Sequence, residues 1–184
     1  MQSGESIPSP SSHTPEGGVL LGSDHAHKRM VLFEDPQCPY CRQFEEVCGA
    51  VLENVRDGGT LTVEYRMRCF LGPESVRAEN ALALAAEESW FDELRKALFS
   101  AQPAEGSGGF TTADLLALGR QVGLASPHYT EGVKESRYQG WVLQREQMFQ
   151  AQDSQGTPAA WLDGRPVDGR VLVDPDALAA LLRQ

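Results

Sequence analysis

Hydrophobic residues divide the first third of the chain into three short elements. Residues 30–33 form a wholly apolar run, which predicts a strand buried on both faces. Residues 41–56 repeat apolar positions at spacings of three and four, which predicts a helix that the Asp-Gly-Gly at residues 57–59 ends. Residues 61–67 alternate with period two, which predicts a strand with one wetter face.

Helical spacing governs the middle of the chain. Residues 74–152 predict a block of helices, which a Gly/Pro/Ser loop at residues 102–109 interrupts. Thr111 and Asp114 have the spacing of a capping box and so predict the start of a helix. A further helix is expected over residues 138–152.

The strand pattern returns at residues 159–162, and the Asp-Gly pair at 163–164 is a strong hairpin signal. Residues 167–171 predict a short return strand. The Asp-Pro pair at 174–175 supplies an N-cap and a first residue for a last helix. Together the elements predict an α/β core with a helical insertion.

The composition suits one domain, or one domain with a large insertion, because 41% of the 184 residues are apolar. The formal net charge of −10 argues against nucleic acids and anionic membrane surfaces as partners. No apolar run approaches the ~20 residues that cross a bilayer, so no membrane span is expected. Residues 1–18 predict a flexible tail, and as they stand they do not have the pattern of a signal peptide. Alternatively, they are what is left of a chain from which a signal peptide was removed.

Two cysteines lie where the first predicted strand meets the first predicted helix, in the sequence Cys38-Pro39-Tyr40-Cys41. Pro39 fits the first helical turn, so Cys38 lies at or beside the N-cap. Unpaired N–H groups and the helix dipole favour an anion there, and we expect the pKa of Cys38 to fall below the free value of ~8.5. Cys41 lies one turn deeper, within bonding reach. An exposed acidic thiol beside a buried one predicts thiol–disulfide exchange.

Two other roles for this pair are open. A zinc site needs about four ligands, so Cys48 and Cys69 would have to complete the set, although Cys48 is two helical turns from Cys41. An inert structural disulfide explains neither the proline nor the strand-to-helix setting. We therefore expect no metal. Cys48 and Cys69 themselves either form a second bridge or remain buried small apolar side chains.

Other titratable residues lie near the first predicted strand. His25 and His27 precede it and are interpreted as loop residues rather than metal ligands. Glu34 or Asp35 at its end could relay a proton to Cys41, because an acid near a buried thiol helps to deprotonate it. Their side chains point to opposite faces of the strand, and the sequence does not say which faces inward.

The residues around the cysteine pair resemble the active-site segment of DsbA-like thiol oxidoreductases of the thioredoxin superfamily. Further segments resemble the next strand, the first inserted helix, the cis-proline segment and the strand and turn after it. In chain order the matching segments are 33–41 with Phe44, 63–66, 77–86, 156–158 and 160–164.

The resemblance covers roughly residues 18–184 and implies a thioredoxin fold with an inserted helical domain. The tail then comprises residues 1–18, and the first part of the thioredoxin fold, with the active site, comprises residues 19–72. The helical insertion comprises residues 73–152. The second part, with the cis-proline, the hairpin and the last helix, comprises residues 153–184.

The resemblance also implies roles for the site residues. Cys38 forms a mixed disulfide and Cys41 resolves it, with Pro39-Tyr40 as active-site support. Thr157-Pro158 is implied to be a cis peptide that faces the disulfide and pairs with the substrate backbone. No cofactor is implied, because the dithiol itself carries two electrons.

Tyr40 departs from the strongly oxidising members of the family, many of which carry histidine at this position. Cys-Pro-Tyr-Cys looks more like glutaredoxins, whose potentials are about −200 to −230 mV against about −120 mV for a strong oxidant. Tyrosine offers no cation to the thiolate, and Glu34, Asp35, Glu45 and Glu46 oppose its charge. We therefore predict a more reducing couple than that of the strong oxidants.

We predict a thiol:disulfide oxidoreductase that exchanges disulfides with protein or peptide thiols through Cys38 and Cys41. A glutaredoxin-like reductase of small mixed disulfides and a peptide-binding module without turnover are the alternatives. We expect the protein to be a monomer. We also expect a redox partner in the membrane to recycle the dithiol. The resemblance implies a bacterial, extracytoplasmic protein, and cytoplasmic residence stays open because no signal is visible.

Overall fold

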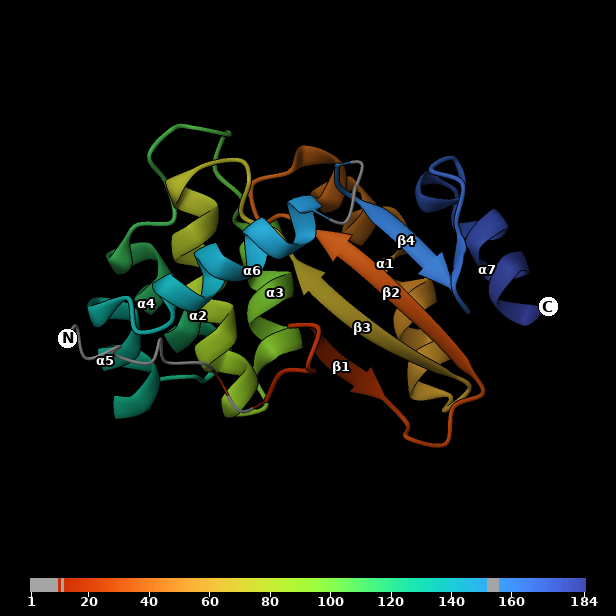
Figure 1. Cartoon of the computed structure of the whole chain (residues 1–184), viewed down its shortest axis with the longest axis horizontal. Coiled ribbons are helices and arrows are strands. Elements are labelled where there is room, and N and C mark those ends of the chain that lie inside the picture. The colour runs from red at the N-terminus through yellow and green to blue at the C-terminus, as the bar shows by residue number, and fades with distance from the viewer. Residues whose placement is uncertain (1–9, 11, 152–155) are drawn as a thin grey trace.

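The computed structural model of the chain describes residues 10, 12–151 and 156–184. Within these residues, five strands form one mixed sheet in the order β1-β3-β2-β4-β5 (Figure 1). β2 and β3 are parallel, and the other neighbouring strands are antiparallel. The strands are β1 (Val19–Gly22), β2 (Lys28–Glu34), β3 (Leu61–Met67), β4 (Ala159–Leu162) and β5 (Arg165–Pro166).

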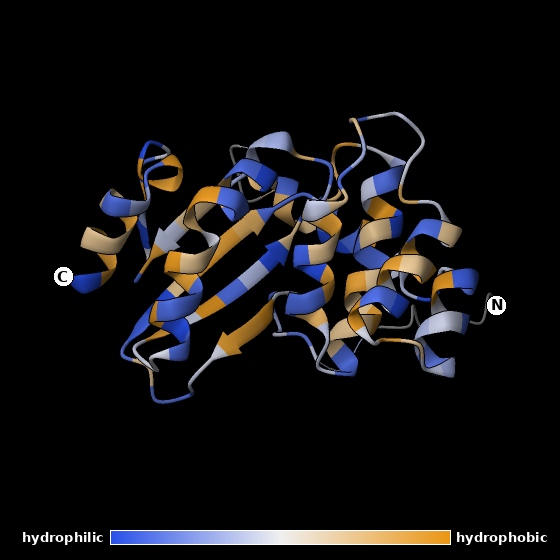
Figure 2. Cartoon of the chain, turned by 180° about the vertical axis from the view of Figure 1, so that it is seen from behind, coloured by the Kyte–Doolittle hydropathy of each residue, from blue (hydrophilic) through white to orange (hydrophobic). Residues whose placement is uncertain are grey.

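Helix α1 (Pro39–Asp57) joins β2 to β3, because parallel neighbours need a crossover connection. Helix α7 (Pro175–Arg183) packs against α1. Figure 1 shows α1 behind the sheet, and Figure 2, seen from the other side, shows α1 in front of it with hydrophobic and hydrophilic residues interspersed along the helix. Leu32 of β2 and Phe44 and Leu52 of α1 are buried in one apolar core between these layers.

Five helices separate β3 from β4 in the described part of the chain. They are α2 (Pro73–Glu87), α3 (Phe91–Ser100), α4 (Thr112–Val122), α5 (Pro127–Glu135) and α6 (Gln139–Ala151). Figure 1 shows α2–α5 grouped beside the sheet, at the end away from α7. α2 contacts α3, α5 and α6, and its many buried alanines let these helices approach closely. The predicted α/β core with a helical insertion is confirmed, although the predicted boundary at 152/153 lies outside the described residues.

Several cap signals in the sequence have the predicted geometry. Thr111 and Asp114 form the capping box that begins α4. Asp174 is the N-cap of α7, where its carboxylate accepts hydrogen bonds from the N–H groups of Asp176 and Ala177. None of the helices in the described part of the chain combines the length and apolar composition that a bilayer crossing needs.

Three local expectations differ from the structure. The strand β1 has no predicted counterpart; it directly follows the residues that the sequence assigned to the tail. The return strand β5 is only two residues long, and the 3₁₀ helix η1 (Val171–Val173) occupies the end of the predicted strand. The predicted solvent-facing side of β3 is covered, because Arg29, Arg66 and Thr14 bind the carboxylate of Glu64 and shield that carboxylate from solvent.

Residues 13–18, which the sequence assigned to a flexible tail, are packed against the domain. The Thr14 hydroxyl donates to Glu64 Oε1 at 2.8 Å, and Arg145 Nη1 donates to the Gly17 carbonyl at 2.7 Å. The His13 ring lies edge-on to Trp141, with 4.7 Å between ring centroids. The rest of the predicted tail, apart from residues 10 and 12, lies outside the described residues.

Candidate active site

The cysteine pair lies at the start of α1, beside the C-terminal ends of the parallel strands β2 and β3 (Figure 1). Cys38 is the N-cap residue and Pro39 follows it at the beginning of the helix, as the sequence predicts. The Cys38 backbone is extended, and its side chain makes no cap hydrogen bond. The first N–H groups of α1 therefore remain available to the Cys38 sulfur.

Both thiols are shielded from solvent. Cys38 is 4% exposed and Cys41 is 0% exposed, and they pack with Phe99 of α3 and with Leu71. The expectation of an exposed Cys38 thiol is wrong, because the insertion and the segment at Thr157 close over the sulfur. The exposed residues of the motif are Pro39 and Tyr40, and Tyr40 is 66% exposed.

The pKa of Cys38 is lowered to about 6. The hydrogen bond from the Cys41 thiol is the largest cause; burial opposes it, and Thr157 and the backbone N–H groups of Cys41 and Tyr40 add to the lowering. In its thiol form, Cys38 Sγ donates to the Thr157 carbonyl at 3.2 Å. The buried Thr157 hydroxyl has no hydrogen-bond partner among the described residues, so it is available to donate to the thiolate.

Cys41 has the opposite electrostatics. Burial raises the pKa of its thiol well above the ordinary value, and the hydrogen bond to Cys38 and the charge of Glu34 raise it further. Near neutral pH, the favoured state of the reduced pair is therefore a Cys38 thiolate beside a Cys41 thiol. This is the asymmetry that thiol–disulfide exchange uses.

Thr157 contacts Cys38 from a segment 119 residues away in sequence. The Thr157–Pro158 peptide bond is cis, as the resemblance implied. Pro158 also lines a cavity of about 560 Å³ together with Trp161, Val167 and Leu172. This cavity is bordered by β4 and η1, and its lining begins one residue after Thr157, the residue that contacts Cys38.

Two buried carboxyl groups end β2, and their environments differ. Burial raises the pKa of Glu34 to about 7, against the opposing charge of Arg95. Burial raises the pKa of Asp35 to about 6, although the Ser75 hydroxyl, at 2.5 Å, and backbone N–H groups donate to its carboxylate. Glu34 is the carboxyl whose charge acts on Cys41. Asp35 holds the segment before α1 in place.

Two glutamines of the site carried no signal in the sequence. Gln102 Nε2 donates to the carbonyls of Pro36 and Cys38, at 2.8 and 3.0 Å. The buried Gln37 side chain accepts from the Gly106 N–H at 3.0 Å. The loop between α3 and α4 is thereby attached to the start of α1. Gln102 belongs to no motif and Gln37 is a residue of the segment 33–41 to which no role was assigned, and both side chains have partners 34 or more residues away.

The remaining cysteines belong to different parts of the chain. Cys48 is a core residue of α1, near Asp174, whereas Cys69 follows β3 and its N–H donates to Glu146 at 3.0 Å. All four cysteines are free thiols in the structure, so a second bridge is not formed. His25 and His27 are exposed in the turn before β2. The described residues contain no cluster of three or more His, Cys, Asp or Glu side chains arranged to hold a metal ion.

A family model described as thioredoxin matches residues 14–183. The chain belongs to the thioredoxin family. A comparison with curated protein sequences gives no match.

Solved structures show the same fold with its helical insertion. The oxidised BdbD of Bacillus subtilis is 21% identical, with a TM-score of 0.79 over 95% of this chain and 96% of that chain. MdbA of Actinomyces oris, described as a thiol-disulfide oxidoreductase, is 20% identical, with a TM-score of 0.82 over 95% and 90%. The reduced DsbA of Mycobacterium tuberculosis is 22% identical, with a TM-score of 0.72 over 90% and 98%. The predicted DsbA-like thioredoxin fold is confirmed.

Proposed function

We propose that this protein is a thiol:disulfide oxidoreductase that exchanges disulfides with protein or peptide thiols. The observation that carries the proposal is the pair of adjacent thiols with opposite pKa shifts, at a helix start that the Thr157 carbonyl contacts. The likeness to MdbA, which is described as an enzyme of this class, supports it.

The exchange proceeds through a mixed disulfide at Cys38. A substrate thiolate attacks the Cys38 sulfur, the Cys38–Cys41 bond breaks, and Cys41 leaves as a thiolate that then takes up a proton. A second substrate thiolate attacks the substrate sulfur of the mixed disulfide and releases Cys38 as a thiolate. The substrate loses two electrons and the protein gains them. The low pKa of Cys38 makes it a good leaving group in this last step.

The cavity beside Pro158 favours an extended polypeptide as the substrate. Its lining from β4 and η1 includes the apolar side chains of Trp161, Val167 and Leu172, and Thr157, the residue before Pro158, contacts Cys38. A small mixed disulfide, the substrate of the glutaredoxin-like alternative, needs no such surface. A binding module without turnover has no need of a Cys38 thiol with a lowered pKa.

We propose that the Cys38–Cys41 disulfide is a weaker oxidant than the disulfide of a strongly oxidising enzyme. The Cys38 pKa of about 6 lies between about 3.5 for a strong oxidant and about 7 for thioredoxin. We place the potential between about −120 and −270 mV accordingly. The proposed place of action is outside the cytoplasm, where protein disulfides persist, with a membrane electron acceptor that reoxidises the dithiol.

A direct test uses a reduced model peptide with two cysteines and the oxidised protein. We expect peptide oxidation by the wild type and by Cys48→Ala, and none by Cys38→Ser. Oxidation that persists in Cys38→Ser would refute the proposal. Turnover of a small glutathione mixed disulfide without turnover of the peptide would favour the glutaredoxin-like alternative. Titration against glutathione gives the potential.

A further inference from the structure

Gln102 joins the helical insertion to the turn that carries Cys38. It directly follows Ala101, the C-cap residue of α3, and its side chain is partly buried. Its Nε2 donates to the Pro36 carbonyl at 2.8 Å and to the Cys38 carbonyl at 3.0 Å. One amide group therefore holds the backbone on both sides of Gln37, in the turn between β2 and α1.

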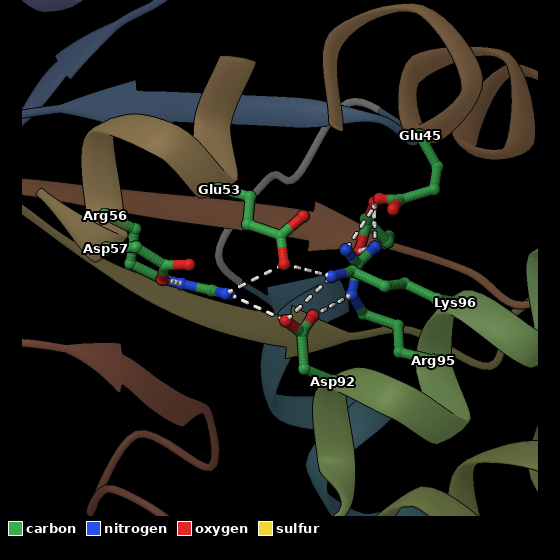
Figure 3. A network of polar contacts seen from close by, with 8 residues as sticks. Glu45, Glu53, Arg56, Asp57, Asp92, Arg95 and Lys96 are labelled. Carbon is green, nitrogen blue, oxygen red and sulfur yellow. Dashed lines mark hydrogen bonds and ion pairs between the residues drawn. The ribbon is translucent and has the colours of Figure 1, made fainter. Parts of the chain in front are cut away.

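Ion pairs hold α3, the helix that precedes Gln102, against the active-site elements. Arg95 of α3 donates from Nη2 to Glu45 of α1 at 2.6 Å. Its Nη1 donates to both carboxylate oxygens of Glu34, at the end of β2, at 3.2 and 3.0 Å. Figure 3 shows Arg95 and Lys96 of α3 within a network of ion pairs that extends to α1. Because α3 is held on both β2 and α1, the residue after its C-cap reaches the beginning of α1 in a fixed position.

The Cys38 carbonyl that Gln102 binds also begins the hydrogen bonding of α1. It accepts from the N–H groups of Cys41 at 3.1 Å and Arg42 at 3.2 Å, and the Gln102 amide is a third donor to the same oxygen. The N–H groups of Tyr40 and Cys41 also bond to the Cys38 sulfur and lower the pKa of its thiol. Since the carbonyl and these N–H groups belong to one helical turn, an amide that fixes the carbonyl also fixes the direction of the N–H groups.

Hydrogen bonds, rather than a charge, are what Gln102 adds to this environment. The titratable groups that act on Cys38 are Cys41 of α1 and Asp35, which follows β2. Three uncharged residues contact the cysteine pair from other parts of the chain: Thr157, Phe99 and Leu71. A neutral amide that orients N–H donors therefore acts on the thiolate without a cation in the site.

We propose that Gln102 is a positioning residue: by holding the Pro36 and Cys38 carbonyls, it keeps the first N–H groups of α1 directed at the Cys38 sulfur and so stabilises the Cys38 thiolate. These donors stabilise the reduced protein more than the disulfide, so the amide makes the disulfide a stronger oxidant. The inference rests on the proposed function, in which this thiolate is the nucleophile and the leaving group. It gives the helical insertion a part in setting the redox potential.

The rate at which iodoacetamide alkylates Cys38 in the reduced protein follows the thiolate directly. In the wild type the rate should rise with pH through an inflection near pH 6. Gln102→Met keeps the length of the side chain but has no N–H donor, so the inflection should move up by about one pH unit. The thiolate fraction at pH 6 should then fall about five-fold and slow the alkylation, whereas alkylation at about pH 9 should be no slower than in the wild type.

Equilibrium with glutathione is a second measurement that a general loss of stability does not reproduce. In Gln102→Met the equilibrium should shift toward the Cys38–Cys41 disulfide by about five-fold at pH 7, because the thiolate loses the same stabilisation. Gln102→Glu places a carboxylate against the two carbonyls and should move the inflection further up. Gln102→Lys restores a donor and should return the inflection toward that of the wild type. These two polar variants test the inference even where Gln102→Met impairs folding.

Arg77→Gln is the matched control, because Arg77 donates to the carbonyls of Gly109 and Phe110 at the other end of the loop between α3 and α4. It loosens the same loop but leaves the contacts of Gln102 in place, so its inflection should stay near pH 6. An unmoved inflection in a folded Gln102→Met, or an equal shift in Arg77→Gln, overturns the inference. A wild type that has the inflection near pH 6 but oxidises no dithiol peptide would instead refute the proposed function alone.

Discussion

The chain contains two kinds of buried cysteine, and their difference shows what makes a thiol reactive. Cys38 and Cys41 are as buried as Cys48 and Cys69. Burial raises the pKa of all four thiols, and three of them end above the ordinary value. Only Cys38 ends below it, because a neighbouring thiol, Thr157 and helix-start N–H groups outweigh the burial.

Position along α1 explains much of this contrast. Cys38 precedes the first turn, where N–H groups have no partner within the helix. Cys48 lies in the middle of the same helix, where the N–H groups bond to preceding carbonyls. Cys69 lies beside the carboxylate of Glu146, which opposes a second negative charge. A lowered thiol pKa therefore requires hydrogen-bond donors aimed at the sulfur.

Removal of the resolving thiol should produce the largest contrast. Cys41→Ser cannot form the Cys38–Cys41 disulfide, so it has no oxidising equivalents to pass to a dithiol peptide. Multiple turnover on that peptide should fall by on the order of 1,000-fold or more, whereas mixing the reduced variant with a disulfide-bonded peptide should give a mixed disulfide at Cys38 that mass spectrometry detects, because Cys41 is no longer there to resolve it. Cys69→Ala should turn over at nearly the wild-type rate. An equal loss in Cys69→Ala would remove the distinction between the two pairs.

Alkylation should distinguish Cys38 from the other three cysteines by about 100-fold in the reduced protein at pH 7, because the thiolate carries the reaction. Intact-mass analysis after brief exposure to iodoacetamide should show one label, and peptide mapping should place it on Cys38. The rate should rise through an inflection near pH 6. Labelling of Cys48 or Cys69 at a similar rate would contradict the assigned thiol environments.

The stability of the reduced protein should depend on pH through Cys38. Its pKa is lower in the folded state than in the unfolded chain, so its stabilisation is complete above ~8.5 and is lost as pH falls through about 6. Glu34 and Asp35 have raised pKa values and act in the opposite direction, but they are also present in Cys38→Ser.

The measurement is the difference between the wild type and Cys38→Ser in urea unfolding under reducing conditions at pH 6 and pH 8. The wild type should gain about 1 kcal/mol over the variant across this range, a value reduced for partial solvent screening. A difference that does not change with pH would mean that Cys38 titrates as an ordinary cysteine.

The smallest expected effect comes from the Thr157 hydroxyl. Thr157→Val keeps the shape of the side chain but removes the donor available to the thiolate, so the pKa of Cys38 should rise. Alkylation at pH 6 should slow a few-fold. The matched control is Thr130→Val on α5, whose hydroxyl donates to the Pro127 carbonyl of the same helix. An unchanged rate in Thr157→Val would mean that the Cys41 thiol and the N–H groups at the helix start lower the pKa of Cys38 without the Thr157 hydroxyl.

Sequence patterns predicted the features that depend on neighbours along the chain. The N-cap position of Cys38, the capping box at Thr111 and the N-cap at Asp174 all follow from residues within one helical turn. The resemblance to a known family added the cis peptide at Thr157-Pro158, which no local pattern contains.

Features that depend on distant partners were missed. Arg95 looks like an ordinary helix residue in the sequence, and its role appears only because α3 packs against the end of β2. The burial of Cys38 and of Glu64 has the same origin, since segments far along the chain cover them. The different environments of Glu34 and Asp35 also depend on distant residues, since Arg95 contacts the first and Ser75 the second.

The separation of Cys38 from Thr157 by 119 residues has a consequence for how the protein is made. The unit β2–α1–β3 is complete at Met67, so a growing chain can assemble the two thiols early from local contacts. β4 pairs with β2 only after the whole insertion has been synthesised. Until then the nascent polypeptide presents a reactive dithiol without its cover, open to premature cross-linking with other chains.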